Sequence, residues 1–413
     1  MNFETKQICV VGGGAAGMMA AGTALLYGAK VTVFESTSRL GKKLAITGKG
    51  RCNVTNNCTT QEFLENVTKN PRFLYAAMNA FDTDSTISFF ENLGVDLKIE
   101  RGKRVYPVSD KAIDIVNALK KYSAEATVIF QKVKKIFLLE NEKFSVIADK
   151  EYIFDKVILA TGGKSYPLTG SDGSGYKLAQ KMGHTVTELL PSLVPLESDS
   201  RLCRDMQGLS LKNVAIKITD PNKKTLYEDF GEMMFAHFGV TGPIILSASA
   251  HLRNTDISKL ILHIDLKPAL DQKALDNRLL LDFGEKSNKD FINSLGALLP
   301  TKMIEPFVST LPFSPRKKVN SITKEERAII LERLKNFEIP LSGFRPIEEA
   351  IITSGGINTK EINPKTMESK IINNLYFAGE MIDVDAYTGG FNLQIAFSTG
   401  YLAGKSAAEY TEE

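Results

Sequence analysis

The sequence predicts an α/β fold in which one parallel-sheet domain is assembled from both ends of the chain and is split by a long insert. Glycine-rich stretches follow strand-like apolar runs at residues 8–17 and again at 375–394. Between about 192 and 350 the pattern changes to short alternating runs and then to helical periodicity. The chain has 413 residues, enough for two or three domains.

The N-terminal glycines have the spacing G-x-G-x-x-G. Gly12 lets the chain turn off the first strand, Gly14 leaves room for a pyrophosphate, and Gly17 lets a helix pack against the sheet. Ala15 and Ala16 lie where that helix begins, and its free N–H groups are expected to face the phosphates. This motif alone would also fit a glycine turn in an unrelated α/β protein.

The elements that follow make the motif specific. A helical run ends at Gly28, a second strand covers Val31–Phe34, and Glu35 stands where a ribose-binding acid is expected. An acid at this position favours an unphosphorylated ribose. The order of strand, glycines, helix, strand and acid therefore predicts a dinucleotide site.

The C-terminal stretch is expected to hold the same ligand. Gly379 and Glu380 follow an apolar strand, where related FAD enzymes place an acid that binds the ribityl or pyrophosphate end, although a solvated acid is the alternative. The last helix is expected to begin in the next glycine pair, with N–H groups that stabilise negative charge on a flavin ring. Its predicted ligand residues are Gly390, Phe391, Asn392 and Leu393, with Asn392 also a candidate N-cap. Together the two ends predict non-covalent FAD in a Rossmann-like FAD/NAD(P)-binding domain.

The segments between the first acid and the insert contribute further elements. Helices are expected at 63–79, 84–93 and 110–124, and a strand at 126–130. A buried parallel strand at 156–160 ends in a glycine turn. Three residues of this part are predicted to contact the cofactor: Val133, which follows a strand where similar FAD proteins bind adenine through the main chain, and Thr161 and Gly162 in the turn.

The predicted domain plan places the FAD-binding domain at 1–191 and 351–413. The insert at 192–350 is expected to be β-rich over about 192–268 and helical over about 269–340. A capping box at Thr323–Glu326 predicts a helix at roughly 324–336.

Composition narrows the function classes. The chain has 51 basic and 48 acidic residues, a net charge of +3, so neither nucleic acid nor an anionic membrane is expected as a partner. The four cysteines form no CxxC pair and no metal-ligand cluster, so no metal is expected. No signal peptide and no apolar run of about 20 residues is present, which predicts a cytoplasmic protein.

Several further stretches resemble the BaiN-like (YhiN-like, aminoacetone oxidase-like) flavoproteins, a family of NAD(P)/FAD-dependent oxidoreductases. The matching stretches are Arg39–Lys43, Gly48–Asn56, Pro191–Leu196, Gly231–Pro243, Glu361–Lys370 and Gly379–Gln394. They cover the chain from end to end and in order. The resemblance implies a split FAD domain and an insert with a β-barrel-like part and a helical part, and it extends distantly to fumarate reductase flavoproteins.

The loops within these stretches contain further candidate site residues. Arg39, Lys42 and Lys43 offer charge to the pyrophosphate or ribityl region, unless they form a solvated basic loop. The residues expected beside the isoalloxazine are Gly48, Gly50, Arg51, Cys52 and Asn53. Arg51, Cys52 and His237 are the candidates for catalysis, with His237 as an acid or base. A redox pair of Cys52 with Cys58 is an alternative to a simple buried thiol.

The predicted activity is that of an FAD-dependent oxidoreductase, with hydride transfer through flavin N5 to or from a small organic substrate at the junction of the FAD domain and the insert. NAD(P)H would be a transient reductant, because no second dinucleotide motif is present. A tRNA-modifying flavoenzyme is one alternative, supported only by Arg316–Lys318 on an expected helical surface. A sensor or scaffold with structural FAD is another.

Overall fold

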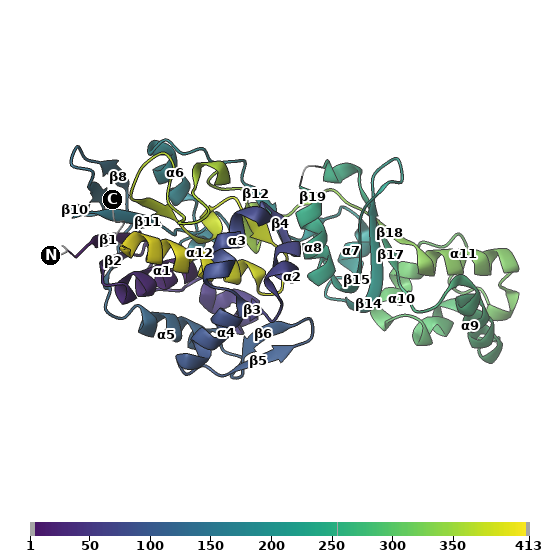
Figure 1. The fold of residues 1–413 in the computed structure, drawn as a ribbon. Coiled ribbons are helices and arrows are strands. Elements are labelled where there is room, and N and C mark those ends of the chain that lie inside the picture. Colours follow the sequence, from purple (N-terminus) through teal and green to yellow (C-terminus); the bar gives the residue numbers. More distant parts are fainter. Residues whose placement is uncertain (1–4, 254, 410–413) are drawn as a thin grey trace. The chain divides into compact units, whose positions relative to one another are not determined.

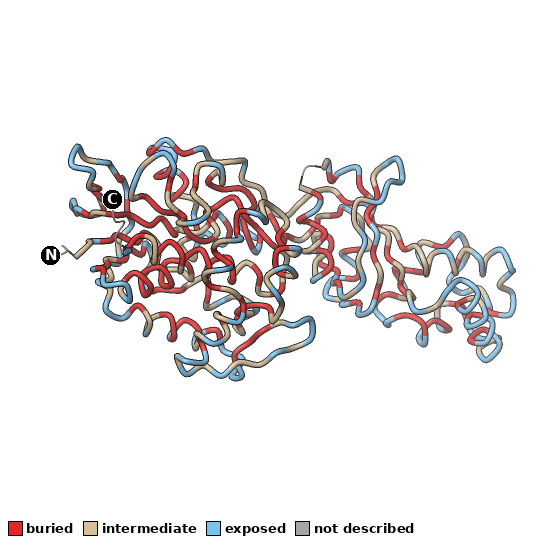
Figure 2. Tube along the Cα trace, in the orientation of Figure 1, coloured by how far each residue is buried: buried red, intermediate tan, exposed pale blue. Residues whose placement is uncertain are grey.

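The structure, a computed structural model, describes residues 5–253 and 255–409, which form two compact units (Figure 1). Unit 1 comprises Met1–Ser192 and Pro346–Glu413, and unit 2 comprises Leu193–Arg345. Each unit has an apolar core of its own, visible as the buried segments inside each unit in Figure 2. The insert was predicted at 192–350.

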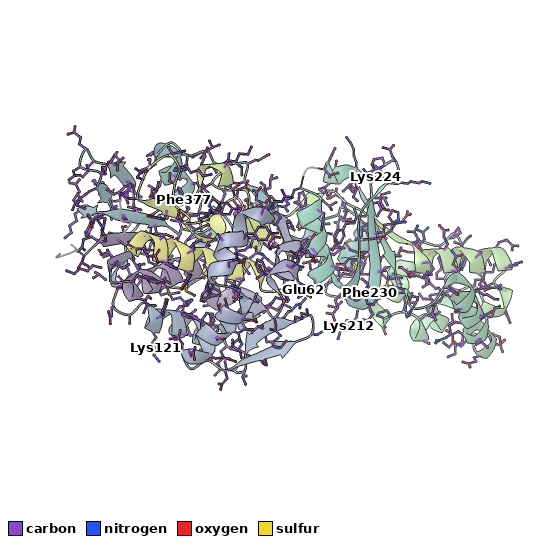
Figure 3. The ribbon with its side chains drawn as sticks, in the orientation of Figure 1. Glu62, Lys121, Lys212, Lys224, Phe230 and Phe377 are labelled. Carbon is purple, nitrogen blue, oxygen red and sulfur yellow. The ribbon has the colours of Figure 1, made fainter. Side chains whose placement is uncertain are left out.

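Unit 1 is built on a parallel five-stranded sheet in the order β21-β11-β1-β2-β7. The strands are β1 (Gln7–Val11), β2 (Lys30–Phe34), β7 (Thr127–Ile129), β11 (Lys156–Leu159) and β21 (Leu375–Phe377). The central strands carry continuous apolar runs because both of their faces are buried. Phe377, fully buried on β21, lies in this core (Figure 3). A Rossmann-type α/β fold is therefore confirmed, and its sheet takes strands from both ends of the chain.

Two helices from opposite ends of the chain pack on this sheet. They are α1 (Ala15–Leu26) and α12 (Phe391–Ala408), which lie side by side in Figure 1. Their close approach depends on glycine, because a Cβ on Gly400 would lie 2.5 Å from the carbonyl oxygen of Ala16. A Cβ on Gly404 would likewise lie 2.3 Å from the carbonyl oxygen of Ala20. The two glycine-rich ends are thus joined directly.

Smaller elements complete unit 1. The helices are α2 (Thr60–Glu65), α3 (Tyr75–Ala80), α4 (Thr83–Asn92), α5 (Ala112–Tyr122) and α6 (Ser174–Lys181). Three small antiparallel sheets join β3 (Thr55–Asn56), β5 (Leu97–Glu100) and β6 (Arg104–Pro107); β8 (Lys135–Leu138), β9 (Phe144–Ile147) and β10 (Glu151–Phe154); and β4 (Val67–Lys69) with β22 (Asp385–Ala386). A fourth pairs β12 (Leu190–Ser192) with β20 (Ile352–Ser354).

The continuous helix expected at 63–79 is wrong. The chain forms α2, then the short strand β4, a 3-10 turn at Pro71–Leu74, and α3. Asn70, directly before Pro71, adopts a left-handed φ of 54°. A residue before proline is disfavoured in the helical region, so the helix cannot run through this point.

Unit 2 combines an antiparallel sheet with helices. The sheet has the order β18-β17-β14-β15-β16-β13-β19. Its strands are β13 (Leu196–Glu197), β14 (Ser210–Thr219), β15 (Thr225–Ala236), β16 (Gly239–Thr241), β17 (Ile261–Asp265), β18 (Phe337–Pro340) and β19 (Gly343–Phe344). β18 and β19 lie at opposite ends of this order, yet only two residues connect them. The sheet must therefore curl until its two edges approach, which gives the barrel-like part.

The helices of unit 2 are α7 (Arg201–Asp205), α8 (Pro243–His251), α9 (Gln272–Glu285), α10 (Thr301–Val308) and α11 (Lys324–Lys335). The capping box at the start of α11 is present, with Thr323 and Glu326 bonding each other's backbone N–H groups. Surface residues of unit 2 such as Lys224 and Phe230 are labelled in Figure 3. No helix within the described residues is long and apolar enough to span a membrane.

Candidate functional site

The carboxyl ends of the parallel strands meet along one side of unit 1, here called the strand-end edge. It comprises the turns that follow β1, β2, β11 and β21. Backbone hydrogen bonds hold these turns in register, from Gly12 N to Phe34 O at 2.8 Å and from Ala160 N to Val11 O at 2.9 Å. Ligands of open parallel sheets bind at such an edge.

The first turn presents the N-terminus of α1 without a cap. Gly14 is the N-cap residue, no side chain accepts a hydrogen bond from the first turn, and that turn contains no acid. A Cβ on Gly14 would meet nothing within 4 Å, so the space in front of it is open. A Cβ on Gly12, by contrast, would lie 2.4 Å from the carbonyl oxygen of Ala160. Free N–H groups beside open space suit a pyrophosphate.

Glu35 is fixed beside this turn. Its carboxylate is 7% exposed, and it accepts hydrogen bonds from the N–H of Gly13 at 2.9 Å and of Thr37 at 2.7 Å. Each oxygen keeps a lone pair for a further donor. This arrangement suits the ribose hydroxyl that the sequence predicts for this acid.

The N-terminus of α12 is also uncapped, and it packs against the loop that contains β3. Its N-cap is Gly390, with a φ of 99°. A Cβ there would lie 2.3 Å from the carbonyl oxygen of Thr55, so only glycine fits. Asn56 Nδ2 donates to the carbonyl oxygen of Gly389 at 3.1 Å. The loop and the helix start are therefore one structure.

Asn392 is not the N-cap that the sequence suggested. It lies inside α12, where its Oδ1 accepts from Ala386 N at 3.0 Å and its Nδ2 donates to Ala386 O at 2.8 Å. The glycine pair before it takes the cap position instead. Phe391 is buried and packs on Phe63 with ring centroids 5.5 Å apart, so these two side chains hold the helix start in place.

Arg51 is turned toward the β5–β6 hairpin. Its guanidinium forms ion pairs with Glu100 and Asp110, both at 2.5 Å, and lies 4.3 Å from the centre of the Tyr106 ring. These hydrogen bonds, first that with Glu100 and then that with Asp110, raise the pKa of Arg51. In this arrangement Arg51 holds its own loop in contact with the β5–β6 hairpin.

Cys52 and Asn53 follow in the same loop. Cys52 is fully buried, and burial raises the pKa of its thiol to about 12. Cys58 is half-buried, and both thiols are free. The buried Oδ1 of Asn53 has no hydrogen-bond partner within the described residues. Such an unpaired atom in a loop beside an open helix start suits a ligand with a polar edge.

Glu380 is the centre of a polar cluster. Its carboxylate accepts from Lys43 Nζ at 2.6 Å, from Ser165 Oγ at 3.0 Å and from Thr353 N at 2.9 Å. Sequence reasoning missed Ser165 and Thr353, because they come from distant segments and belong to no local motif. Lys42 Nζ donates to the carbonyl oxygen of Leu168 at 2.6 Å. The cluster ties the turn after β21 to the basic loop after β2.

The remaining predicted residues are spread over both units. Val133 is buried after β7, and Arg39 is exposed. In the turn after β11, Thr161 Oγ1 lies 3.9 Å from Met381 Sδ. His237 belongs to unit 2, on the exposed tip between β15 and β16, with its ring 5.1 Å from that of Phe238. The described residues contain no group of three or more side chains that could hold a metal.

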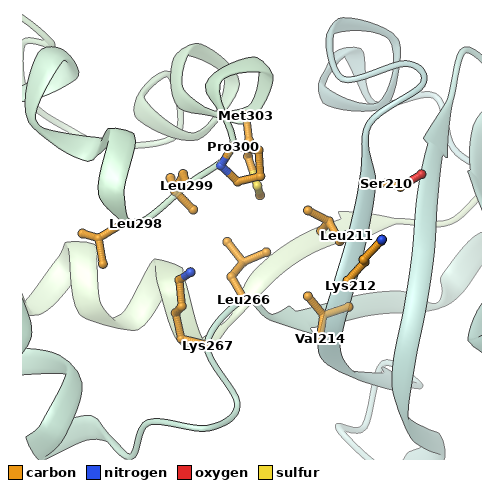
Figure 4. A pocket seen from close by; sticks show the side chains of 10 residues that line it. All are labelled: Ser210, Leu211, Lys212, Val214, Leu266, Lys267, Leu298, Leu299, Pro300 and Met303. Atoms are coloured by element: carbon orange, nitrogen blue, oxygen red, sulfur yellow. The ribbon is translucent and has the colours of Figure 1, made fainter.

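A small pocket of about 110 Å³ lies in unit 2 (Figure 4). Buried apolar side chains line most of it, and Lys212 and Lys267 stand at its wall. It contains none of the predicted site residues. Its volume is well below the roughly 300 Å³ of the smallest common ligand pockets, so it is no site for a dinucleotide.

The residues of the strand-end edge fit FAD. They offer two uncapped helix starts, an open space at Gly14, a fixed acid at Glu35 and an unpaired amide oxygen at Asn53. The contacts of each residue with a bound cofactor remain predictions.

Comparison with known proteins supports this picture. A family model described as HI0933-like protein Rossmann domain matches residues 6–406. The 3-dehydro-bile acid delta(4,6)-reductase of Clostridium scindens is 29% identical over 416 residues, covering 98% of this chain and 99% of the relative. The ribosomal RNA dihydrouridine synthase of Haemophilus influenzae is 29% identical, covering 96% and 97%. That of Escherichia coli is 26% identical, covering 97% of both chains.

Solved structures agree at the level of the fold. The 3-ketosteroid-delta4-(5alpha)-dehydrogenase of Rhodococcus jostii has a TM-score of 0.51 at 15% identity and covers 99% of both chains. A quinol-fumarate reductase has a TM-score of 0.51 at 15% identity and covers 98% of this chain and 71% of its own.

Two of the relatives are named for RNA, so the comparisons give no support to the expected absence of nucleic acid as a partner. The family model spans nearly the whole chain. The chain therefore belongs to the HI0933-like family of Rossmann-domain proteins, within the FAD-dependent oxidoreductases.

Proposed function

We propose that this FAD-dependent oxidoreductase reduces a carbon–carbon double bond conjugated to a carbonyl group. The observation that carries the reaction type is shared by two sets of relatives. One is named as a delta(4,6)-reductase, and the others as dihydrouridine synthases. Dihydrouridine is uridine with its ring double bond reduced, so both names describe the addition of two hydrogens across a carbon–carbon double bond.

The cofactor's contribution is the hydride chemistry at flavin N5, which when FAD is bound connects a reductant such as NAD(P)H to the substrate carbon. The chain's own residues bind and orient it. The N-terminus of α1 holds the pyrophosphate, and Glu35 holds the adenosine ribose. Arg39 and Lys42 add positive charge, and Val133 faces the adenine through its main chain.

The flavin end is held by the other half of the edge. The N-terminus of α12 favours negative charge at the ring edge in front of it. Asn53 supplies an unpaired oxygen that accepts a hydrogen bond. Glu380 and Lys43 lie at the ribityl end, where their ion pair at 2.6 Å fixes both side chains. The turn residues that line the approach to the flavin are Gly48, Gly50, Thr161 and Gly162.

The second hydrogen of the product arrives as a proton. We assign it to His237, an exposed imidazole in the loop between β15 and β16 and a side chain of the type that most often serves as a general acid. The test is His237→Gln. Flavin reduction by NAD(P)H should be unchanged, while substrate reduction should fall about 100-fold, the usual contribution of a general acid. Equal substrate rates in the variant would remove His237 from the reaction.

A small enone is the preferred substrate, and uracil in RNA is the second candidate. The RNA candidate is favoured by the names of two relatives. Charge argues against it. Lys317 is paired with Glu326 at 2.6 Å and Lys318 with Asp290 at 2.8 Å, and both lie in a loop rather than on the expected helix. Two of the three cations proposed to contact RNA are therefore already neutralised.

One experiment separates these readings. The purified protein would be titrated anaerobically with NADH and NADPH while the flavin absorbance is followed. The reduced protein would then receive either a 3-keto-4-ene steroid or ribosomal RNA that lacks dihydrouridine. Reoxidation with gain of two hydrogens by the steroid supports the enone, and the same gain in RNA supports the second candidate. A flavin that neither nucleotide reduces, or that neither acceptor reoxidises once it is reduced, contradicts the proposal and favours structural FAD.

A further inference from the structure

Seven buried side-chain atoms within the described residues have no hydrogen-bond partner. They are Asn53 Oδ1, Ser171 Oγ, Tyr176 Oη, His184 Nδ1, Asp282 Oδ2, Arg333 Nε and Asp383 Oδ1. Leaving a buried polar atom unpaired is unfavourable by about 1–3 kcal/mol, so each such atom needs an explanation.

Two of them face a charged neighbour. His184 Nδ1 lies 3.3 Å from Glu361 Oε2, and Asp383 Oδ1 lies 2.7 Å from Lys69 Nζ. A small rotation of either side chain closes a hydrogen bond inside the protein, so neither atom needs an external partner.

The next three lie in helices outside the strand-end edge. Tyr176 lies within α6, outside the turns that make up the strand-end edge. Asp282 belongs to α9 in unit 2. Arg333 belongs to α11 in unit 2. Asn53 and Ser171 remain, and Asn53 is already expected beside the flavin.

Ser171 lies on the strand-end edge, in the segment between β11 and α6. It is 5% exposed, and its Oγ lies 2.8 Å from the position that a Cβ on Gly162 would take. The residue before it, Gly170, lies close to Glu35, the acid expected to bind the ribose. A Cβ on Gly170 would lie 3.5 Å from Glu35 Oε1. Ser171 is therefore placed between the turn after β11 and the acid after β2.

We propose that Ser171 is a ligand of the dinucleotide, with its hydroxyl donating a hydrogen bond to an oxygen on the adenosine side of the pyrophosphate. The proposal rests on FAD binding at the strand-end edge as inferred above. A hydroxyl can turn its proton toward an anionic oxygen, and hydrogen bonds to charged groups are the strong ones. The missing partner of Ser171 is then supplied by the cofactor.

The test is Ser171→Ala, compared with the wild type as FAD-free and FAD-loaded protein. FAD affinity should fall about 10- to 100-fold, the range for a lost hydrogen bond to a charged group. The thermal midpoint of the FAD-free variant should equal or exceed that of the wild type, because the change removes an unpaired buried atom. Opposite effects on the two forms are the signature of a ligand contact.

Ser123→Ala is the matched control. Ser123 is equally buried at 5% exposure, but its hydroxyl donates to the carbonyl oxygen of Leu119 at 2.9 Å. This control should lower the thermal midpoint of the FAD-free protein and leave FAD affinity unchanged.

Three results have distinct meanings. If the wild type does not bind FAD, the proposed function itself fails. If the wild type binds FAD and Ser171→Ala binds it equally well, the inference is overturned and the hydroxyl bonds a buried water instead. If Ser171→Ala destabilises both forms by the same amount, Ser171 is structural and the inference is likewise overturned.

Discussion

Two helices at the strand-end edge of unit 1, α1 and α12, differ from two helices of unit 2, α9 and α11, in how the backbone N–H groups at their starts are satisfied. At the edge, α1 and α12 both begin at a glycine and have no side-chain cap. In unit 2, Asp271 caps α9 and the capping box of Thr323 caps α11. Helix starts carry orphan N–H groups that some partner must satisfy.

This difference indicates where a bound ligand supplies hydrogen-bond partners that the protein itself leaves out. The starts of α9 and α11 are closed by side chains of unit 2, so these two helices have no need of a bound molecule there. The edge leaves N–H groups and two buried side-chain atoms open. Among these four helices, the difference shows in the sequence as glycine at the N-cap position of α1 and α12 and Asp or Thr at that of α9 and α11.

The variants with the largest expected difference in effect replace one glycine in each region. Gly390→Ala would place a Cβ 2.3 Å from the carbonyl oxygen of Thr55 at a φ of 99°. We expect the unfolding free energy to fall by about 3 kcal/mol and FAD binding to be lost, because αL strain and overpacking add. Urea unfolding and FAD titration are the measurements.

Its control is Gly284→Ala in α9, where the new Cβ would meet nothing within 4 Å. The expected result is a gain of about 0.5–1 kcal/mol, the usual effect of replacing glycine in a helix, with unchanged FAD affinity. If both variants lost stability alike, the edge would be no more constrained than an exposed helix.

A second pair of variants compares two side chains, those of Glu35 and Thr323, that accept hydrogen bonds from backbone N–H groups. Glu35→Gln removes the charge from the carboxylate held by Gly13 and Thr37. FAD affinity should fall about 10-fold, since a hydrogen bond to a charged group is weakened. Thr323→Ala removes the cap of α11 and should lower the unfolding free energy by about 1 kcal/mol with no change in FAD affinity. A matching loss of FAD affinity in Thr323→Ala would contradict the separation of the two regions.

Much of this contrast could be read from the sequence, because its signals are local. The first strand, the three glycines, the helix, the second strand and Glu35 occur within one short stretch. The capping box of α11 is equally local, and the structure contains it. Residues that act through their immediate neighbours leave a pattern that spacing alone reveals.

The features that were missed depend on distant segments or on a single overlooked residue. Ser165 reaches Glu380 across 215 positions of sequence, and no motif connects them. The misplaced cap at Asn392 has a local cause, since the preceding glycine pair turns the chain and takes the cap position at Gly390. Pro71 likewise interrupts the helix expected there, a signal that was present but outweighed by the apolar periodicity.

A third prediction tests whether a buried histidine inside unit 1 behaves differently from the open edge. The imidazole of His184 lies between Ser369 Oγ, 2.9 Å from Nε2, and Glu361. Burial lowers its pKa below the usual value, although Glu361 opposes the shift. The unfolded chain therefore binds a proton more readily than the folded one, so this part of the stability is present above about pH 6.5 and is lost as pH falls.

His184→Asn should remove that dependence. With FAD saturating, wild-type unfolding free energy should drop more steeply than that of the variant between neutral and mildly acidic pH, by up to about 1.4 kcal/mol per pH unit. Parallel slopes for the two proteins would show that His184 is protonated equally in both states.

The smallest expected effect concerns Cys52, which lies in the loop beside the edge but is closed off from solvent. With a thiol pKa of about 12 caused by burial, almost no thiolate is present at neutral pH. The Cys58 thiol is also held protonated, because burial, and secondarily Glu62, raise its pKa to about 11. A redox pair of the two is therefore disfavoured. Anaerobic titration with dithionite should require two electrons per FAD, the capacity of the flavin alone, and Cys58→Ser should require the same. An uptake of two further electrons, lost in Cys58→Ser, would establish the pair and place Cys52 among the reacting groups of the edge.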